Sequence, residues 1–127
     1  MVPSRPLIIV AEDEGVLRLV VTIGLEDCGF QVLEAVDGQA AWELLRARPD
    51  CRLIVSDVRM PRMDGYVLAH RVLSLEVHPP ILLLTGYADP LPEYLKNRIT
   101  LLPKPVPLEV LCERAKSICG NPNSTPH

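Results

Sequence analysis

Short apolar runs alternate along the chain with longer segments in which apolar residues recur at helical spacing. The runs have the length of buried strands and cover residues 7–11, 30–35, 53–55, 81–84 and 99–102. The longer segments predict amphipathic helices at 16–28, 39–48, 66–75 and 108–118, and a short helix is expected to begin at 89–92. Five strands that alternate with five helices predict an α/β fold, with a parallel sheet covered by helices on both faces. The strands are apolar throughout, as burial on both faces requires.

Length and composition indicate a single domain. The chain has 127 residues, of which 48% are apolar and 23% charged, and we expect a domain over residues 1–120 and a disordered polar tail over 121–127. Lys plus Arg number 13 against 16 Asp plus Glu, which argues against a dedicated nucleic-acid binder. The apolar runs are too short to span a bilayer, and the N-terminus lacks the apolar stretch of a signal peptide. We therefore expect a cytoplasmic protein with no membrane partner.

The four cysteines show no pattern typical of a metal or redox site. Cys28, Cys51, Cys112 and Cys119 form no C-x-x-C pair, and no histidine stands at zinc-binding spacing from them. Because intracellular proteins rarely keep disulfides, we expect reduced thiols in the core or at the surface. The three histidines are scattered along the chain and are assigned no role.

The residues with useful chemistry stand where the expected strands end. They are Glu12 and Asp13 after the first strand, Asp57 after the third, Thr85 after the fourth and Lys104 after the fifth. Taken singly, each is typical of a turn, a helix cap or a solvated loop. In an open parallel sheet, however, ligands bind beyond the carboxyl ends of the strands, so these side chains are expected to converge.

Four other acidic residues lie near this edge of the sheet. Glu34 and Asp37, from the second strand and the turn after it, are not clearly directed toward the others. Glu14 and Asp64 are interpreted as a helix-start and a turn residue.

The charges of the expected cluster point to phosphoryl chemistry. Three carboxylates in one crevice repel one another and need a cation to stay ionised together. Lys104 supplies one positive charge and Mg²⁺, which prefers hard oxygen ligands, would supply two more. A phosphoryl group on one carboxylate would add negative charge that the metal, the lysine and the threonine hydroxyl can stabilise. The sequence therefore predicts phosphoryl transfer onto an aspartate.

Four stretches resemble the receiver domain of two-component response regulators, over roughly residues 6 to 119. They are IIVAEDE (8–14), LIVSDVRMPRMDG (53–65), ILLLTGY (81–87) and LPKP (102–105). The resemblance implies a flavodoxin-like (βα)5 three-layer sandwich with strand order 2-1-3-4-5. It also implies that a sensor histidine kinase transfers a phosphoryl group from its phosphohistidine to an aspartate of this domain.

The resemblance also implies roles for single residues. Asp57 would be the phosphoacceptor, and Thr85 and Lys104 would contact the phosphoryl oxygens. The implied Mg²⁺ ligands are Glu12, Asp13, Asp57 and the backbone carbonyl of Arg59. The remaining implied roles are structural: Pro61 and Gly65 shape the loop after the acceptor, and Pro105 follows a cis peptide bond.

The chain departs from the common receiver pattern at the residues that are expected to transmit the signal. Leu101 stands where many members of the family carry an aromatic residue, while Thr85 is followed by Gly86 and Tyr87. This resembles the subset with a Phe-Ala-Thr-Gly-Tyr motif, whose fourth helix is short or mobile. We therefore take Tyr87 and a flexible segment at 88–98 as candidates for transmitting the signal. Arg59 and Tyr87 are also expected to flank the entry of the hydrolytic water.

These residues indicate a signalling module and not an enzyme that turns over a diffusible substrate. Its expected partners are a sensor histidine kinase or phosphotransfer protein and a downstream protein target, with the domain as a monomer or weak homodimer. A stand-alone receiver and the receiver of a hybrid kinase both fit. The alternatives are a phosphorylation-independent interaction module and, with less support, a metal-dependent phosphatase with an aspartyl-phosphate intermediate.

Overall fold

Five parallel strands form one sheet in the order β2-β1-β3-β4-β5. The structure is a computed structural model, and it describes residues 5–86 and 90–120. The strands are β1 (Leu7–Ala11), β2 (Gln31–Ala35), β3 (Leu53–Asp57), β4 (Ile81–Thr85) and β5 (Thr100–Pro103). The helices are α1 (Gly15–Asp27), α2 (Gly38–Ala47), α3 (Gly65–Leu73), α4 (Leu108–Cys119) and a single 3-10 turn, η1 (Glu93–Leu95). The flavodoxin-like fold and the strand order 2-1-3-4-5 expected from the sequence are confirmed.

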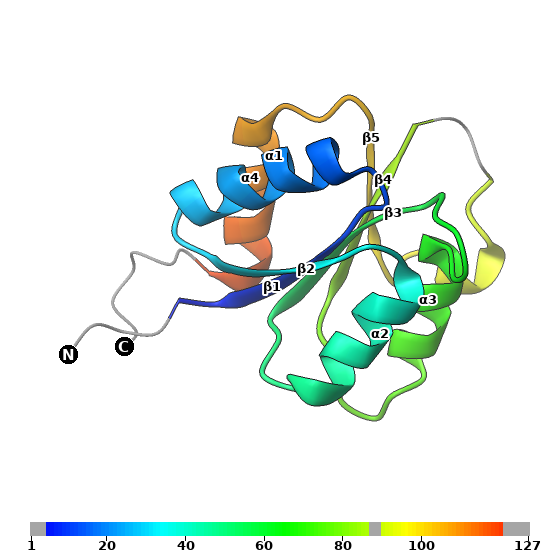
Figure 1. Ribbon diagram of the computed structural model, residues 1–127. Coiled ribbons are helices and arrows are strands. Elements are labelled where there is room, and N and C mark those ends of the chain that lie inside the picture. Colours follow the sequence, from blue (N-terminus) through cyan, green and yellow to red (C-terminus); the bar gives the residue numbers. More distant parts are fainter. Residues whose placement is uncertain (1–4, 87–89, 121–127) are drawn as a thin grey trace.

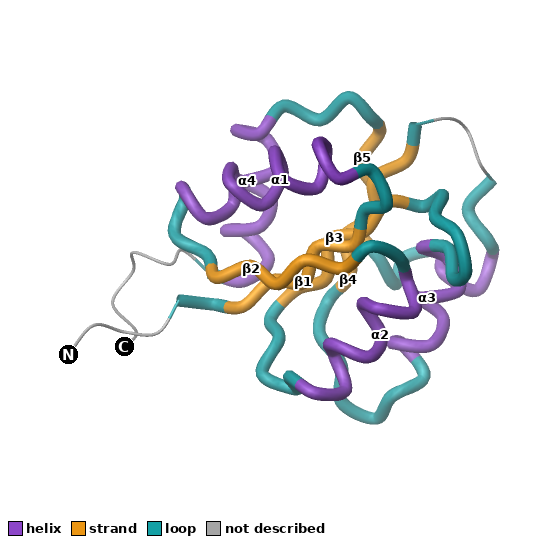
Figure 2. Tube along the Cα trace, in the orientation of Figure 1, coloured by secondary structure: helices purple, strands orange, loops and turns teal. Residues whose placement is uncertain are grey.

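Helices cover both faces of the sheet, so the molecule has three layers (Figure 1). Residues Leu7, Ile9 and Ala11 of β1 belong to the core beneath α2, α3 and η1. Residues Ile8 and Val10, which point to the opposite face, belong to the core beneath α1 and α4. The loops after β1, β3 and β5 lie at the same end of the sheet (Figure 2). Polar residues in these loops can therefore meet.

The connection between β4 and β5 contains a short helical turn just after 89–92, where a short helix was expected to begin. Its described part contains η1, a single 3-10 turn at Glu93–Leu95, which begins after Pro92. Prolines at 90 and 92 have no N–H to donate, so this short connection cannot hold a regular helix across them. Leu95 is completely buried against the core on the α3 side and anchors the connection.

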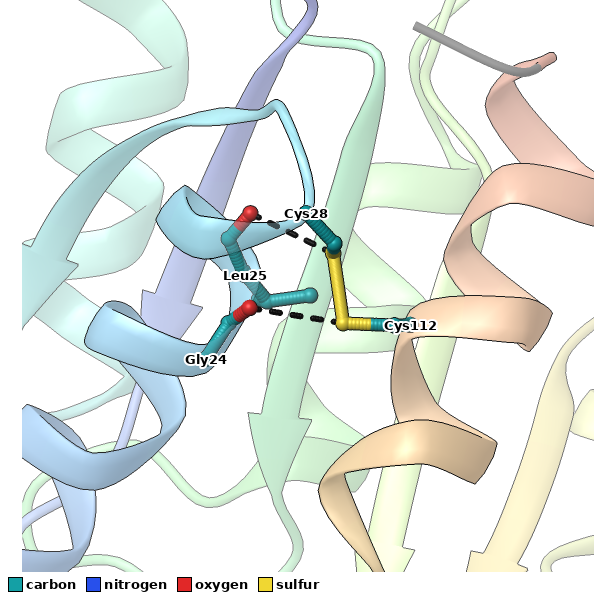
Figure 3. Close-up of a disulfide and its surroundings, with 4 residues drawn as sticks. All are labelled: Gly24, Leu25, Cys28 and Cys112. Carbon is teal, nitrogen blue, oxygen red and sulfur yellow. Dashed lines mark hydrogen bonds between the residues drawn. A yellow bond between two sulfur atoms is a disulfide. The ribbon is translucent and has the colours of Figure 1, made fainter.

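The expectation that the four cysteines are reduced thiols is wrong for two of them. Cys28, at the end of α1, and Cys112, in α4, form a disulfide with their Cα atoms 6.5 Å apart (Figure 3). The sequence gives no local sign of this pair because the two residues are 84 positions apart. Cys51 and Cys119 are free and buried, as expected. Burial raises the pKa of both thiols, that of Cys119 to about 11.

The two ends of the described fold meet at one residue. The backbone N–H of Arg52 donates to the carbonyl of Leu7 at 2.8 Å, at the start of β1. Its guanidinium donates to the carbonyl of Cys119 at 3.0 Å, at the end of α4. Among the described residues, no helix combines the length and apolar character needed to cross a membrane.

Candidate functional site

The three expected carboxylates gather at the carboxyl end of the sheet. Ala11 of β1 pairs with Ser56 of β3, and this register sets the residues that follow them, Glu12 and Asp57, side by side. Asp13 comes next in the loop after β1. Each of the three acids offers a carboxylate oxygen, and these oxygens lie within 4.8 Å of one another. The convergence expected from the strand ends is therefore present in the structure.

Lys104 brings a positive charge to the same cluster. Its Nζ lies 2.9 Å from Asp57 Oδ1 and 3.6 Å from Glu12 Oε1. Its backbone N–H donates to the carbonyl of Thr85 at 2.7 Å, which fixes the loop after β5 against the end of β4. Thr85 itself is half-buried and ends β4, the strand next to the one that ends in Asp57. The lysine and the threonine thus stand at the same edge as the acids.

The electrostatics of the cluster favour a cationic ligand. Burial raises the pKa of the Glu12 carboxyl, and the charge of Asp57 raises it further. Burial lowers the pKa of Lys104, but its hydrogen bond to Asp57 and the charges of Asp57 and Glu12 outweigh burial and raise it overall. One ammonium group therefore faces three carboxyl groups. A divalent cation would remove the remaining repulsion.

The donor set fits Mg²⁺. Three carboxylates, one of them exposed, offer hard oxygen ligands and leave room for water, which this ion retains when bound. Arg59, whose backbone carbonyl is the fourth expected ligand, lies two residues after Asp57 in the exposed loop that follows β3. Its part in metal binding stays a prediction.

The loop after β3 folds back tightly because Gly65 has no side chain. The N–H of Gly65 donates to the carbonyl of Val58 at 2.7 Å. A Cβ at this position would collide with the carbonyl oxygen of Asp57 and the Cα of Val58. The expected role of Gly65 in shaping this loop is therefore confirmed. The expected cis peptide bond before Pro105 is also present.

The other acidic residues have structural partners. Asp64 caps α3 by accepting from the N–H of Val67 at 2.9 Å, in agreement with its interpretation as a turn residue. Asp37 is buried at the start of α2, where it accepts from the N–H of Ala40 at 2.8 Å and pairs with Arg62 at 2.6 Å. Neither belongs to the acidic cluster that could hold a metal ion.

One residue at the site was missed in the sequence. The Arg18 guanidinium donates to the backbone carbonyl of Glu12 at 2.8 Å and to the carboxylate of Glu34 at 3.1 Å. It thereby ties α1 and β2 to the turn that carries Glu12 and Asp13. A single arginine on an amphipathic helix gives no signal for such a role, because its partners come from separate elements.

Of the two residues expected to transmit the signal, Tyr87 and Leu101, the structure describes Leu101. Tyr87 lies outside the described residues, as does the start of the segment at 88–98. Leu101 lies in β5, is half-buried and packs against the core on the α2 and α3 side of the sheet. The transmission of a signal through either residue stays a prediction.

Comparisons with known proteins agree on one family. The family model described as response regulator receiver domain matches residues 8–116. The transcriptional regulatory protein PdtaR of Mycobacterium tuberculosis is 40% identical over 90 residues, which are 69% of this chain and 42% of PdtaR. The response regulator receiver protein CpdR of Brucella abortus is 35% identical over 81 residues, 64% of this chain and 67% of CpdR. This chain thus spans less than half the length of PdtaR.

The fold is similar to a solved receiver domain as well. The crystal structure of the receiver domain from the hybrid histidine kinase CckA matches with a TM-score of 0.76 and 32% identity. The match covers 89% of this chain and 98% of that one. The similarity therefore extends over almost the whole of both domains.

Proposed function

Since the chain belongs to the response regulator receiver domain family, we propose that Asp57 accepts a phosphoryl group from the phosphohistidine of a histidine kinase or phosphotransfer protein. The observation that carries this proposal is the position of the Asp57 carboxylate. It lies within 4.8 Å of two further acids and 2.9 Å from the ammonium group of Lys104. The nucleophilic carboxylate thus has one cation beside it, and the two acids next to it offer ligands for a second, divalent cation.

In the proposed transfer, a carboxylate oxygen of Asp57 attacks phosphorus while the bond from phosphorus to the donor imidazole nitrogen breaks. The group at residue 57 then changes from one negative charge to about two. Lys104, already beside this carboxylate, would donate to a phosphoryl oxygen, and the Thr85 hydroxyl would donate to another. The proposed Mg²⁺ ligands are Glu12, Asp13, Asp57 and the Arg59 backbone carbonyl. Mg²⁺ bound to these ligands would supply positive charge that stabilises the phosphoryl oxygens.

In the proposed role the domain acts as a switch: phosphorylation changes how it binds its partner, and the domain does not turn over a diffusible substrate. We assign the switch to a domain at 1–120 that acts in the cytoplasm. Its partners are the phosphoryl donor and a downstream protein, and not nucleic acid or membrane. As a monomer or weak homodimer it fits both a stand-alone receiver and the receiver of a hybrid kinase. Tyr87 and Leu101 are the proposed transmitters of the signal.

A phosphotransfer assay tests the proposal. The full chain is incubated with a panel of phosphorylated histidine kinases and with a small acyl phosphate, with Mg²⁺ present and then chelated. Acid-labile phosphate should appear only with Mg²⁺ and should be absent from Asp57→Asn. Asp50→Asn is the matched control, because Asp50 is an exposed aspartate whose partner is Arg48. Phosphate on Asp57→Asn would contradict Asp57 as the acceptor, and none on the wild type would instead support a phosphorylation-independent interaction module.

A further inference from the structure

The Cys28–Cys112 disulfide joins the two helices that flank one side of the candidate site. Cys28 follows the last residue of α1, and Cys112 lies in α4 (Figure 3). Both side chains are half-buried and not enclosed in the core. The two residues of the pair are therefore each partly exposed to solvent.

A backbone carbonyl oxygen lies near each sulfur and can accept a hydrogen bond from the thiol in the reduced state. Cys28 Sγ lies 3.4 Å from the carbonyl oxygen of Leu25, and Cys112 Sγ lies 3.3 Å from that of Gly24. Both carbonyls belong to the last turns of α1 (Figure 3). When the disulfide is opened, each new S–H group has an acceptor within reach and needs no large rearrangement. The position thus accommodates the oxidised and the reduced pair.

The two joined helices begin in loops that carry the site. α1 starts at Gly15, two residues after Asp13, and α4 starts at Leu108, four residues after Lys104. A groove of about 490 Å³ runs between these helices and reaches both Glu12 and Lys104. At Gly24 the helices approach so closely that a Cβ would lie 2.9 Å from a methyl carbon of Leu108. The packing of α4 on α1 therefore lies next to the loop that carries Lys104.

We propose that the Cys28–Cys112 pair is a reversible redox site that sets how firmly α4 and the Lys104 loop are held against α1. This inference rests on the proposed function for its consequence at Asp57. In the cytoplasm assigned above, a disulfide is usually transient and redox-sensing. Cys51 and Cys119 are buried and take no part, so the response is confined to one pair.

The chemistry is thiol–disulfide exchange. The thiolate of a thiol reductant attacks one of the two sulfurs, forms a mixed disulfide with it and releases the other cysteine as a thiolate, which takes up a proton. A second thiolate attacks the reductant's sulfur in the mixed disulfide and releases the first cysteine. Two electrons and two protons thus pass to the protein, and the reductant leaves as its own disulfide. A disulfide oxidant reverses both steps.

Reduction should loosen the end of the sheet that carries Lys104. Without the disulfide, α4 is held on α1 by side-chain packing and by a weak hydrogen bond from the Cys112 thiol to the Gly24 carbonyl, and the groove between them can widen. The Lys104 ammonium group would then spend less time beside Asp57. We expect slower phosphorylation in the reduced state, by about fivefold or more, the lower end of ordinary coupling between two sites.

The test uses the full wild-type chain equilibrated with reduced or oxidised dithiothreitol. Acid quenching, alkylation under denaturing conditions and peptide mass mapping give the state of each cysteine. Amide hydrogen exchange over 104–119 and phosphorylation by a small acyl phosphate, after removal of the reductant, are measured on the same samples. We expect the Cys28–Cys112 pair to open and close reversibly in the native protein. The reduced state should show faster exchange and slower phosphorylation.

Two variants serve as controls. Cys28→Ser combined with Cys112→Ser should behave like the reduced wild type under both conditions. Cys51→Ser keeps the disulfide and should respond as the wild type does. Equal amide exchange in the two states, or a disulfide that does not respond to thiol reductant in the folded protein, would overturn the redox site. Absence of phosphate in both states would count against the proposed function and the predicted rate effect, while thiol mapping and exchange would still decide the redox site.

Discussion

The buried carboxylate of Asp37 affects the stability of this domain in a way that the hydrophobicity pattern of the sequence does not predict. Asp37 is almost completely buried, yet its carboxylate has two donors, the N–H of Ala40 and the guanidinium of Arg62. The Ala40 hydrogen bond lowers the pKa of Asp37, burial opposes this, and Arg62 lowers it further, with a net decrease. The charged form of Asp37 therefore stabilises the folded state.

The lowered pKa of Asp37 predicts a pH-dependent contribution to stability. Because the pKa is lower in the folded than in the unfolded chain, the contribution is complete above the unfolded value of about 3.9. It is lost as the pH falls through the folded value. Urea unfolding should show Asp37→Asn to be less stable than the wild type at pH 7, with a difference that shrinks below about pH 4. A difference that stays constant down to acidic pH would contradict this origin.

Gly65 gives a prediction about the loop beside the phosphoacceptor. A methyl group there would collide with backbone atoms of Asp57 and Val58 and not with the end of a flexible side chain. Gly65→Ala should cost about 1–3 kcal/mol of unfolding free energy, as overpacking does. Urea denaturation measures this. Gly15→Ala is the matched control, because its nearest neighbour would be Arg18 Nη2 at 3.8 Å and no loss of stability is expected.

At the scale of elements, apolar runs located the strands well because β1, β3 and β4 are buried almost along their whole length. The edge strands β2 and β5 are only partly buried. The run at 7–11 coincides with β1, and the other strands and the helices α1 to α4 differ from the expected ranges by one or two residues at an end. Such differences arise at caps: the turn at Asp37 and Gly38 is in fact the start of α2, with Asp37 as its cap. The 3-10 turn η1 follows from tertiary packing of Leu95, which sequence spacing does not show.

The part of the candidate site that is formed by residues at the ends of strands could be predicted from the sequence. Glu12, Asp57 and Lys104 each follow a strand, and a parallel sheet brings such residues together whatever their separation in sequence. Arg18 and the cysteine pair were not predictable in this way. Their contacts depend on how α1 packs against β2 and α4, and helix packing leaves no fixed spacing in the sequence.

The disulfide between α1 and α4 predicts a stability difference between the oxidised and reduced chain. It closes a loop with a sequence separation of 84, which restricts the unfolded chain strongly. Reduction should lower the free energy of unfolding by about 2–4 kcal/mol. Guanidinium unfolding with and without reductant measures this difference. The double variant Cys28→Ser, Cys112→Ser should show no response to reductant, and equal midpoints for the oxidised and reduced wild type would refute the prediction.

At the scale of the whole molecule, the acidic cluster predicts stabilisation by metal. The folded chain brings three carboxyl groups together and the unfolded chain does not, so Mg²⁺ should bind the folded state preferentially. The stabilisation should reach about 2.7 kcal/mol when free Mg²⁺ is about 100 times its dissociation constant. Thermal unfolding with Mg²⁺, compared with sodium at equal ionic strength, measures it. Asp13→Asn should reduce the shift, and an unchanged shift would place the ion elsewhere.

The contacts of Arg52 with both ends of the fold have a consequence for chain connectivity. Because Leu7 and Cys119 are held by one residue, a short linker could join the two ends without crossing the sheet. A new start at Val77, which is 87% exposed in the loop before β4, would open the chain at the end of the sheet away from Asp57. Such a circular permutant should fold and keep its affinity for Mg²⁺, since every strand and every residue of the acidic cluster keeps its neighbours.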